Sequence, residues 1–154
     1  MTLLALDIGQ VRTGVAVSDP AERVASPLKV IPTVELTQGS REFRRIISDY
    51  SDICLLVGLP LSLDGQEHQQ ATWVREQAET IARQYGLPLV FHDERRSSAQ
   101  AESVLREMGY NAQSMRGKVD MIAASIFLQS YLDGLGRDNN DRKGLNGCQT
   151  LSDR

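Results

Sequence analysis

The chain of 154 residues is 41% hydrophobic and 24% charged, which is ordinary for a globular protein and predicts one domain around one core. No apolar run approaches the roughly 20 residues that span a bilayer, so the sequence predicts no membrane partner. The net charge of −3 argues against a protein that coats nucleic acid by charge alone.

The start of the chain and its cysteines carry two further expectations. The first residues, Met-Thr-Leu-Leu, contain no basic region or cleavage site, and we therefore expect a cytoplasmic protein. Cys54 and Cys148 match neither the spacing of a metal site nor a disulfide framework. We expect Cys54 to be buried in an apolar strand and Cys148 to be incidental in a polar stretch.

Three predicted strands open the chain. Residues 3–6 are short and apolar, which favours a central strand, and residues 14–18 alternate small and β-branched side chains on the way back. Residues 24–31 contain Pro27, which is typical of a strand near the edge of a sheet. We expect these three strands to form an antiparallel meander.

Helices and parallel strands are predicted to alternate after the meander. Apolar side chains recur on one face over four segments, which predicts helices at residues 40–50, 69–85, 99–108 and 118–132. Continuous apolar runs typical of parallel strands covered on both faces occupy residues 53–57 and 87–91. Residues 135–154 contain hardly an apolar side chain, so we expect a disordered polar tail after a domain of residues 1–134.

This order of elements predicts an α/β fold with a mixed five-stranded sheet: a three-strand meander plus parallel strands, with helices on both faces. In such sheets, ligands bind beyond the carboxyl ends of the parallel strands. Three acids occupy places that meet there. Asp7 ends the first strand, Glu94 ends the last strand, and Asp120 lies in the first turn of the last helix.

Carboxylates that lie this close need cations, because like charges raise one another's pKa. Oxygen ligands without His or Cys suit Mg²⁺ or Mn²⁺, and two such ions clamp the attacking and leaving oxygens of phosphoryl transfer. Asp7, Glu94 and Asp120 therefore predict a two-ion site that hydrolyses phosphodiester bonds. Asp93 is the alternative to Glu94, since neighbours along a strand point to opposite faces.

Four stretches of the chain also resemble the YqgF family, which is called RuvX-like as well. They are LALDIGQVRTGVAVSD, VGLPLSLDG, FHDERRSS and KVDMIAASIFLQSYL, and together they span residues 3–132. Each motif is weak alone, whereas their order and spacing are specific. The family commonly has Thr where Ser97 and Ser98 stand, and a hydroxyl is retained there.

The resemblance implies a ribonuclease H-like fold in which Asp7, Glu94 and Asp120 are the metal-binding catalytic acids. It also implies a nuclease that matures the 5′ end of precursor 16S ribosomal RNA, with ribosomal precursor particles as partners. The family has been proposed to act as Holliday junction resolvases too, which makes branched DNA the alternative substrate.

Five basic residues are candidates to contact phosphates on either side of the cut bond: Arg12, Arg95, Arg96, Arg116 and Lys118. Because Arg95 and Arg96 adjoin two acids, a salt bridge within the protein is the alternative for each. His92 is a candidate to orient water, although a single histidine at a strand end is more often a packed, hydrogen-bonded residue.

Two other classes of protein stay open at this point. Actin-like kinases and ATPases hold nucleotide phosphates with a similar Asp-x-Gly hairpin, but they need two such domains. An inactive RNA-binding scaffold would keep the fold, and the presence of all three acids argues against it. The sequence is compatible with a monomer or a homodimer, and a junction cutter needs the two sites of a dimer.

Overall fold

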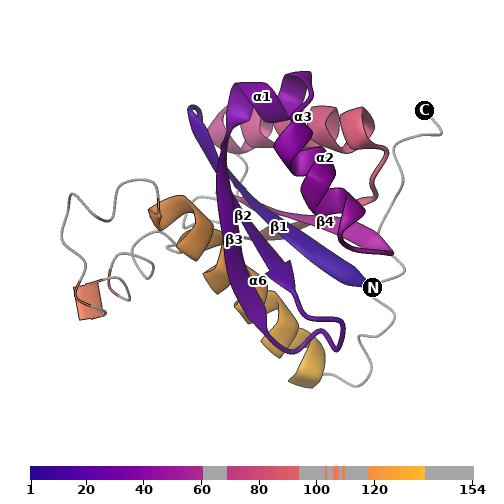
Figure 1. Ribbon diagram of the computed structural model, residues 1–154. Helices are drawn as coiled ribbons and strands as arrows, with labels where there is room; N and C mark the ends of the chain where they lie inside the picture. The colour runs from indigo at the N-terminus through magenta and orange to yellow at the C-terminus, as the bar shows by residue number, and fades with distance from the viewer. Residues whose placement is uncertain (61–68, 94–102, 104–105, 108, 110–117, 138–154) are drawn as a thin grey trace.

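The computed structural model describes residues 1–60, 69–93, 103, 106–107, 109 and 118–137. Five strands form one sheet in the spatial order β3-β2-β1-β4-β5 (Figure 1). Their bounds are β1 Thr2–Ile8, β2 Arg12–Ser18, β3 Ala25–Pro32, β4 Ile53–Leu59 and β5 Leu89–Asp93. β2 pairs antiparallel with β1 and β3, while β4 pairs parallel with β1 and β5. The predicted mixed five-stranded sheet is confirmed, with β3 at one edge.

Helices cover both faces of this sheet, as predicted (Figure 1). Three helices contribute to the core on one face: α1 Thr33–Gln38, α2 Arg41–Ser48 and α3 Gln69–Tyr85. On the other face, α6 Val119–Arg137 packs over the second core. No helix in the described ranges is long and apolar enough to cross a membrane.

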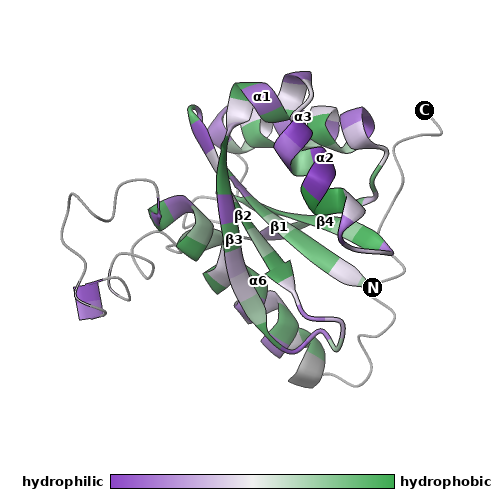
Figure 2. Ribbon diagram, in the orientation of Figure 1, coloured by the Kyte–Doolittle hydropathy of each residue, from purple (hydrophilic) through white to green (hydrophobic). Residues whose placement is uncertain are grey.

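The alternation of β1 assigns its side chains to these two cores. Leu4, Leu6 and Ile8 join the core beneath α1, α2 and α3. Leu3 and Ala5 join the core beneath α6. Figure 2 shows hydrophobic residues concentrated along the central strands. Because period-2 alternation continues along a strand, Asp7 belongs to the face that α6 covers.

Several elements differ from their expected bounds, and α1, β5 and α6 are examples. α1 was not expected, because a helix of six residues is too short to show a clear apolar period. β5 continues past Phe91 to Asp93, since Gly58 and Leu59 of β4 pair with its last residues. α6 runs to Arg137, so residues 135–137 are helical where a disordered tail was expected, while residues 138–154 lie outside the described part.

Cys54 lies where the sequence predicted it. It lies in β4 with 1% of its surface exposed, which agrees with a buried position. The second cysteine of the chain, Cys148, lies outside the described residues.

Tyr85 connects α3 to α1 and to the start of α2. Its hydroxyl donates to the Leu36 carbonyl and accepts from the Ser40 amide, both at 2.8 Å. The ring of Tyr85 also meets Phe43 edge to face, with 4.7 Å between ring centroids. Ser40 is the N-cap of α2, and its side chain accepts from the Phe43 amide at 3.1 Å.

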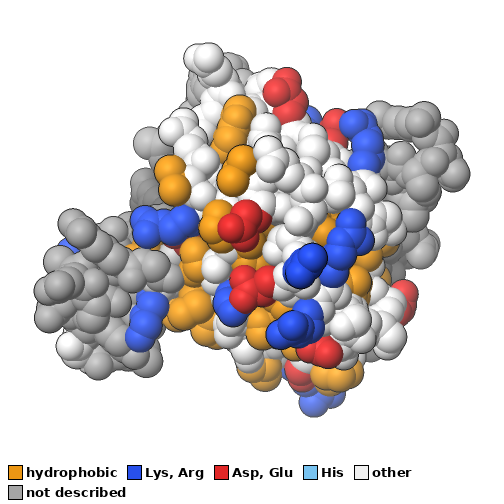
Figure 3. Space-filling model, turned by 45° about the horizontal axis from the view of Figure 1, so that its top comes forward, with side chains coloured by type: hydrophobic (Ala, Val, Ile, Leu, Met, Phe, Trp, Pro, Cys, Tyr) orange, Lys and Arg blue, Asp and Glu red, His pale blue; other side chains and the backbone are white. Residues whose placement is uncertain are grey.

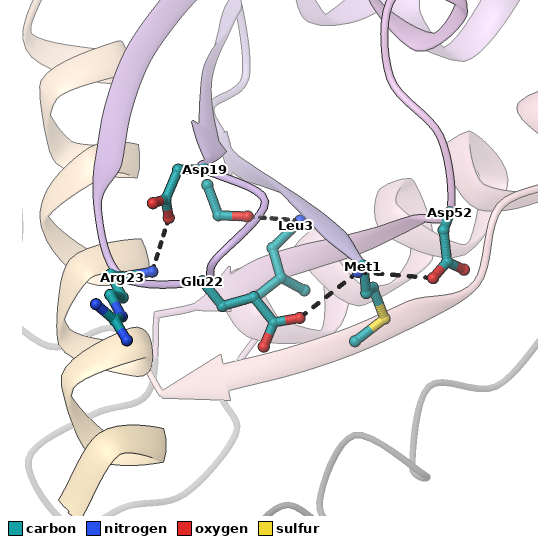
Figure 4. A network of polar contacts seen from close by, with 7 residues as sticks. Met1, Leu3, Asp19, Glu22, Arg23 and Asp52 are labelled. Atoms are coloured by element: carbon teal, nitrogen blue, oxygen red, sulfur yellow. Dashed lines mark hydrogen bonds and ion pairs between the residues drawn. The ribbon is translucent and has the colours of Figure 1, made fainter.

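A polar network secures the end of the sheet away from Asp7 (Figure 4). The amino group of Met1 lies 3.9 Å from a Glu22 carboxylate oxygen and 3.7 Å from one of Asp52. Asp19 accepts from the amides of Val24 and Arg23, which lower the pKa of its carboxyl. These contacts hold the turn between β2 and β3 close to the start of β1.

Gln129 attaches α6 to the same turn. Its side-chain oxygen accepts from the Ala25 amide, and its side-chain nitrogen donates to the Arg23 carbonyl, each at 2.9 Å. The middle of α6 is thereby fixed against β3, and the hydrophobic side chains of α6 pack over β1 and β2. These contacts fix the middle of α6. They do not fix its first turn, which lies at the other end of β2.

Gly14 determines where the first turn of α6 lies, because the backbone of that helix packs against it. A Cβ atom at Gly14 would lie 2.0 Å from the Asp120 carbonyl oxygen and 2.5 Å from the Met121 nitrogen. Real Cβ atoms do not approach backbone so closely, so a larger residue would displace the helix. The hydrogen atom of glycine is what lets α6 begin directly over β2.

We predict that Gly14→Ala lowers the free energy of unfolding by about 1–3 kcal/mol, because overpacking must displace the first turn of α6. The matched control is Gly134→Ala, since Gly134 lies in α6 and an added Cβ would meet nothing within 4 Å. Alanine there should stabilise the protein by about 0.5–1 kcal/mol through helix propensity. Urea unfolding of both variants measures the difference, and a Gly14→Ala variant as stable as the parent would contradict the close contact.

Candidate active site

Asp7 lies near the carboxyl end of β1, where its backbone pairs with Gly14 of β2. The carboxyl group follows Leu3 and Ala5 on the face covered by α6, and the residue is half-buried. A charge in this position loses part of its hydration, and nearby polar or cationic groups must compensate for the loss. The expected place of Asp7 at the end of a buried strand is therefore confirmed.

Asp120 reaches the same place from the opposite layer. It is the second residue of α6, and its carbonyl group lies directly against Gly14. Because Gly14 is the ladder partner of Asp7, the absence of a side chain there brings the first turn of α6 next to the end of β1. The structure thus gathers two of the three predicted acids, Asp7 and Asp120, at one end of the sheet.

The electrostatic environment of Asp120 is unfavourable for its charged form. Its side chain is 31% exposed, and burial raises the pKa of the carboxyl group above its ordinary value. Arg12 partly offsets this effect, with Nε 3.7 Å from Asp120 Oδ2. The Arg12 side chain is 52% exposed, so water weakens the ion pair. A further cation beside Asp120 would favour the carboxylate.

A tight turn between β1 and β2 places Arg12. The Gly9 amide donates to the Arg12 carbonyl at 2.9 Å, and a Cβ at Gly9 would lie 2.6 Å from that same oxygen. Glycine is therefore required at position 9 for this turn. Arg12 follows as the first residue of β2 and extends toward the start of α6.

The other predicted site residues are placed only in part. Lys118 precedes α6, where its carbonyl accepts from the Ile122 amide at 3.1 Å. Four predicted residues lie outside the described part of the chain: Glu94, Arg95, Arg96 and Arg116. Among the residues that are described, no group of three or more His, Cys, Asp or Glu side chains could hold a metal ion.

His92 lies on the α6 face of β5, in contact with two aromatic residues. Its ring is stacked on Phe127, with 6.5 Å between ring centroids, and meets Tyr131 edge to face at 5.5 Å. The interpretation of His92 as a packed residue is thereby supported. Phe127 and Tyr131 are four residues apart on the predicted apolar stripe of α6, which was the sequence signal for this contact.

Two residues near the site were missed from the sequence. Thr13 and Thr33 are buried, and their hydroxyl groups lie 2.8 Å apart beneath the turn that carries Arg12. Thr33 begins α1, the helix that was not expected. The only sequence signal for Thr13 was its polar side chain within an apolar strand.

The surface at the α1 end of the molecule mixes both signs of charge. Figure 3 shows Lys and Arg side chains beside Asp and Glu, with hydrophobic side chains among them. The exposed hydrophobic residues include Val11 in the turn and Val34 in α1. The described part of this face therefore presents no continuous basic patch, in keeping with the net negative charge.

A solved structure resembles the whole arrangement. The Holliday junction resolvase of fowlpox virus superimposes with a TM-score of 0.51 at 15% sequence identity, covering 88% of this chain and 100% of that one. At this identity the likeness shows the fold alone. It confirms the predicted ribonuclease H-like fold.

Sequence comparison finds relatives of higher sequence identity. A protein of Anaeromyxobacter sp. (strain Fw109-5) is 40% identical over 134 residues, which are 87% of this chain and 98% of the relative. One of Roseiflexus sp. (strain RS-1) is 37% identical over 131 residues, which are 85% and 93%. Both bear the name "Putative pre-16S rRNA nuclease". A family model described as "RuvX: Holliday junction resolvase" matches residues 1–134. The chain therefore belongs to the RuvX family.

Proposed function

We propose that this chain is a metal-dependent nuclease that hydrolyses phosphodiester bonds in the 5′-end maturation of precursor 16S ribosomal RNA. The observation that carries the proposal is the contact of Asp120 with Gly14, which brings that acid beside Asp7. The names of the relatives support the substrate, and membership of the RuvX family supports the class of reaction.

The residues present fit a divalent cation. Asp7 and Asp120 offer hard oxygen donors, and burial disfavours the charge of Asp120 unless a cation compensates for it. Mg²⁺ is commonly held by one or two carboxylates together with substrate phosphates. A pair of Mg²⁺ or Mn²⁺ ions would stabilise the charge on the attacking and leaving oxygens when bound.

Glu94 completes the proposed ligand set. It directly follows β5, whose residue His92 contacts Phe127 and Tyr131 of α6. Since side chains two residues apart along a strand share a face, the sequence pattern groups Glu94 with His92, and Asp93 with Phe91. This supports the choice of Glu94 over Asp93, although Glu94 itself lies outside the described residues.

The basic residues have a separate role in the proposal. Arg12 is exposed enough to reach a phosphate of the substrate while it stays beside Asp120. We propose the same role for Lys118, Arg95, Arg96 and Arg116. Charge-assisted hydrogen bonds from these residues would position the backbone on either side of the cut bond.

The second candidate function is cleavage of Holliday junctions, which the description of the family model favours. Such an enzyme cuts two strands and needs two sites, so it would act as a homodimer, whereas end maturation of an RNA needs one.

The actin-like alternative is disfavoured, because the described strands form a single sheet and not the pair of domains that closes over a nucleotide. We propose that the protein acts in the cytoplasm, where ribosomal precursor particles would be its partners.

Asp7→Asn should reduce cleavage at least about 100-fold, because the variant keeps the shape of the side chain and loses the charge that holds the cation. The assay offers precursor ribosomal RNA ends, four-way DNA junctions and unstructured single strands, with Mg²⁺ or Mn²⁺ at one salt concentration. Asp49→Asn is the matched control, since Asp49 is an exposed residue at the end of α2, and it should cleave like the parent. Full activity of Asp7→Asn would refute the site, and equal cutting of all substrates would refute the preference for precursor RNA.

Asp120→Asn should stabilise the metal-free protein at neutral pH. The folded-state pKa of Asp120 is raised, so this group favours folding below the unfolded-state value near 3.8 and loses that contribution as pH rises through the folded-state pKa. Asparagine imitates the neutral form at every pH. The increase in Tm on substitution, measured by thermal unfolding with a chelator, should therefore be larger at pH 7 than at pH 4. A constant or inverted difference would contradict the stated environment of Asp120.

A further inference from the structure

We propose that Thr33 is a positioning residue of the active site, and that its backbone amide and buried hydroxyl hold the turn that presents Arg12 to the substrate. The proposal rests on the proposed nuclease function for its catalytic consequence. It assigns a role to a residue that touches neither acid in the described geometry and that lies in a different layer of the molecule.

Thr33 contacts the turn through two groups. Its amide donates to the Val11 carbonyl at 3.0 Å, and its hydroxyl donates to the Gly9 carbonyl at 2.6 Å. The Thr13 hydroxyl lies 2.8 Å from the Thr33 hydroxyl. Because the single hydrogen of the Thr33 hydroxyl is given to Gly9, Thr13 must be the donor in that pair. Both threonine side chains are excluded from water.

The turn depends on these bonds because its own side chains do not anchor it. Val11 is 74% exposed and leaves the core, and Gly9 has no side chain. Within the turn, the Gly9 amide donates to the Arg12 carbonyl at 2.9 Å. Two of the turn's carbonyl groups, those of Gly9 and Val11, are then held from below by one residue of α1.

Arg12 connects this support to the acids. It is the residue at which the turn ends, and its Nε lies 3.7 Å from Asp120 Oδ2. The side chain is half exposed, so few packing contacts fix its direction and the backbone position of the turn must do so. A displacement of about 1 Å in a group that positions substrate can cost about 100-fold in rate. Thr33 therefore acts on catalysis through Arg12.

The test compares Thr33→Val with Thr33→Ser in the same cleavage assay. Valine keeps the volume of threonine and loses the hydroxyl, and we expect kcat/KM to fall about 10-fold or more. Serine keeps the hydroxyl and should stay within about threefold of the parent. The matched control for a buried hydroxyl is Ser18→Ala, which removes the acceptor of the Leu3 amide at the opposite end of β2. It should lower Tm and leave kcat/KM within about threefold.

A double-mutant cycle tests the route through Arg12. If Thr33 acts by placing Arg12, Thr33→Val should change kcat/KM by less than about threefold once Arg12 is alanine, because coupled residues are not additive. An undiminished 10-fold loss in the Arg12→Ala background would overturn this route.

Hydrogen exchange of the Gly9 amide gives a readout that does not depend on activity. In the metal-free protein, Thr33→Val should accelerate this exchange at least about 10-fold, while Ser18→Ala and Thr33→Ser should not. Unchanged exchange would overturn the anchoring, and faster exchange with unaltered cleavage would overturn the positioning role. An inactive Asp7→Asn variant beside a fully active Thr33→Val variant would refute this inference and keep the proposed function. An Asp7→Asn variant as active as the parent would refute the function itself.

Discussion

The close approach of α6 to Gly14 is the contact on which the rest of the site depends. Any side chain at Gly14 would collide with the backbone of Asp120, so this one position decides where the helix begins. The hydrophobic residues of α6 and Gln129 hold the helix against the sheet elsewhere, but they do not require its first turn to lie beside Asp7. The tight packing of α6 on Gly14 therefore also determines where the carboxyl group of Asp120 lies.

That constraint also creates the electrostatic conflict of the site. Two carboxyl groups brought to one end of a buried sheet lose hydration, and the exposed Arg12 compensates only in part for Asp120. Two partly buried carboxyl groups at one place lower the stability of the fold, and such groups are typical of functional sites. On the other side of the sheet, Thr33 and Thr13 hold the turn that carries Arg12 by hydrogen bonds that water does not reach. The acids and the arginine thus have rigid supports in different layers.

Much of the fold and part of the site could be predicted from the sequence. The spacing of apolar side chains along a strand or helix indicates which of its faces is buried. The apolar run of β4 predicted a parallel strand, the apolar period of residues 40–50 predicted α2, and the acids at element ends predicted where Asp7 and Asp120 lie. Contacts between layers could not be predicted in the same way. The six residues of α1 carry too little pattern, and the role of Thr33 depends on which backbone groups the folded turn leaves unpaired.

The central claim is that Asp7 and Asp120 bind one divalent cation site together. Electron paramagnetic resonance of Mn²⁺ titrated with the full-length protein measures the affinity directly, without any substrate. The account predicts that Asp7→Asn and Asp120→Asn each weaken Mn²⁺ binding by about 10-fold or more, and that Asp49→Asn leaves it unchanged. Binding that is lost in one acid variant and fully retained in the other would contradict a shared site.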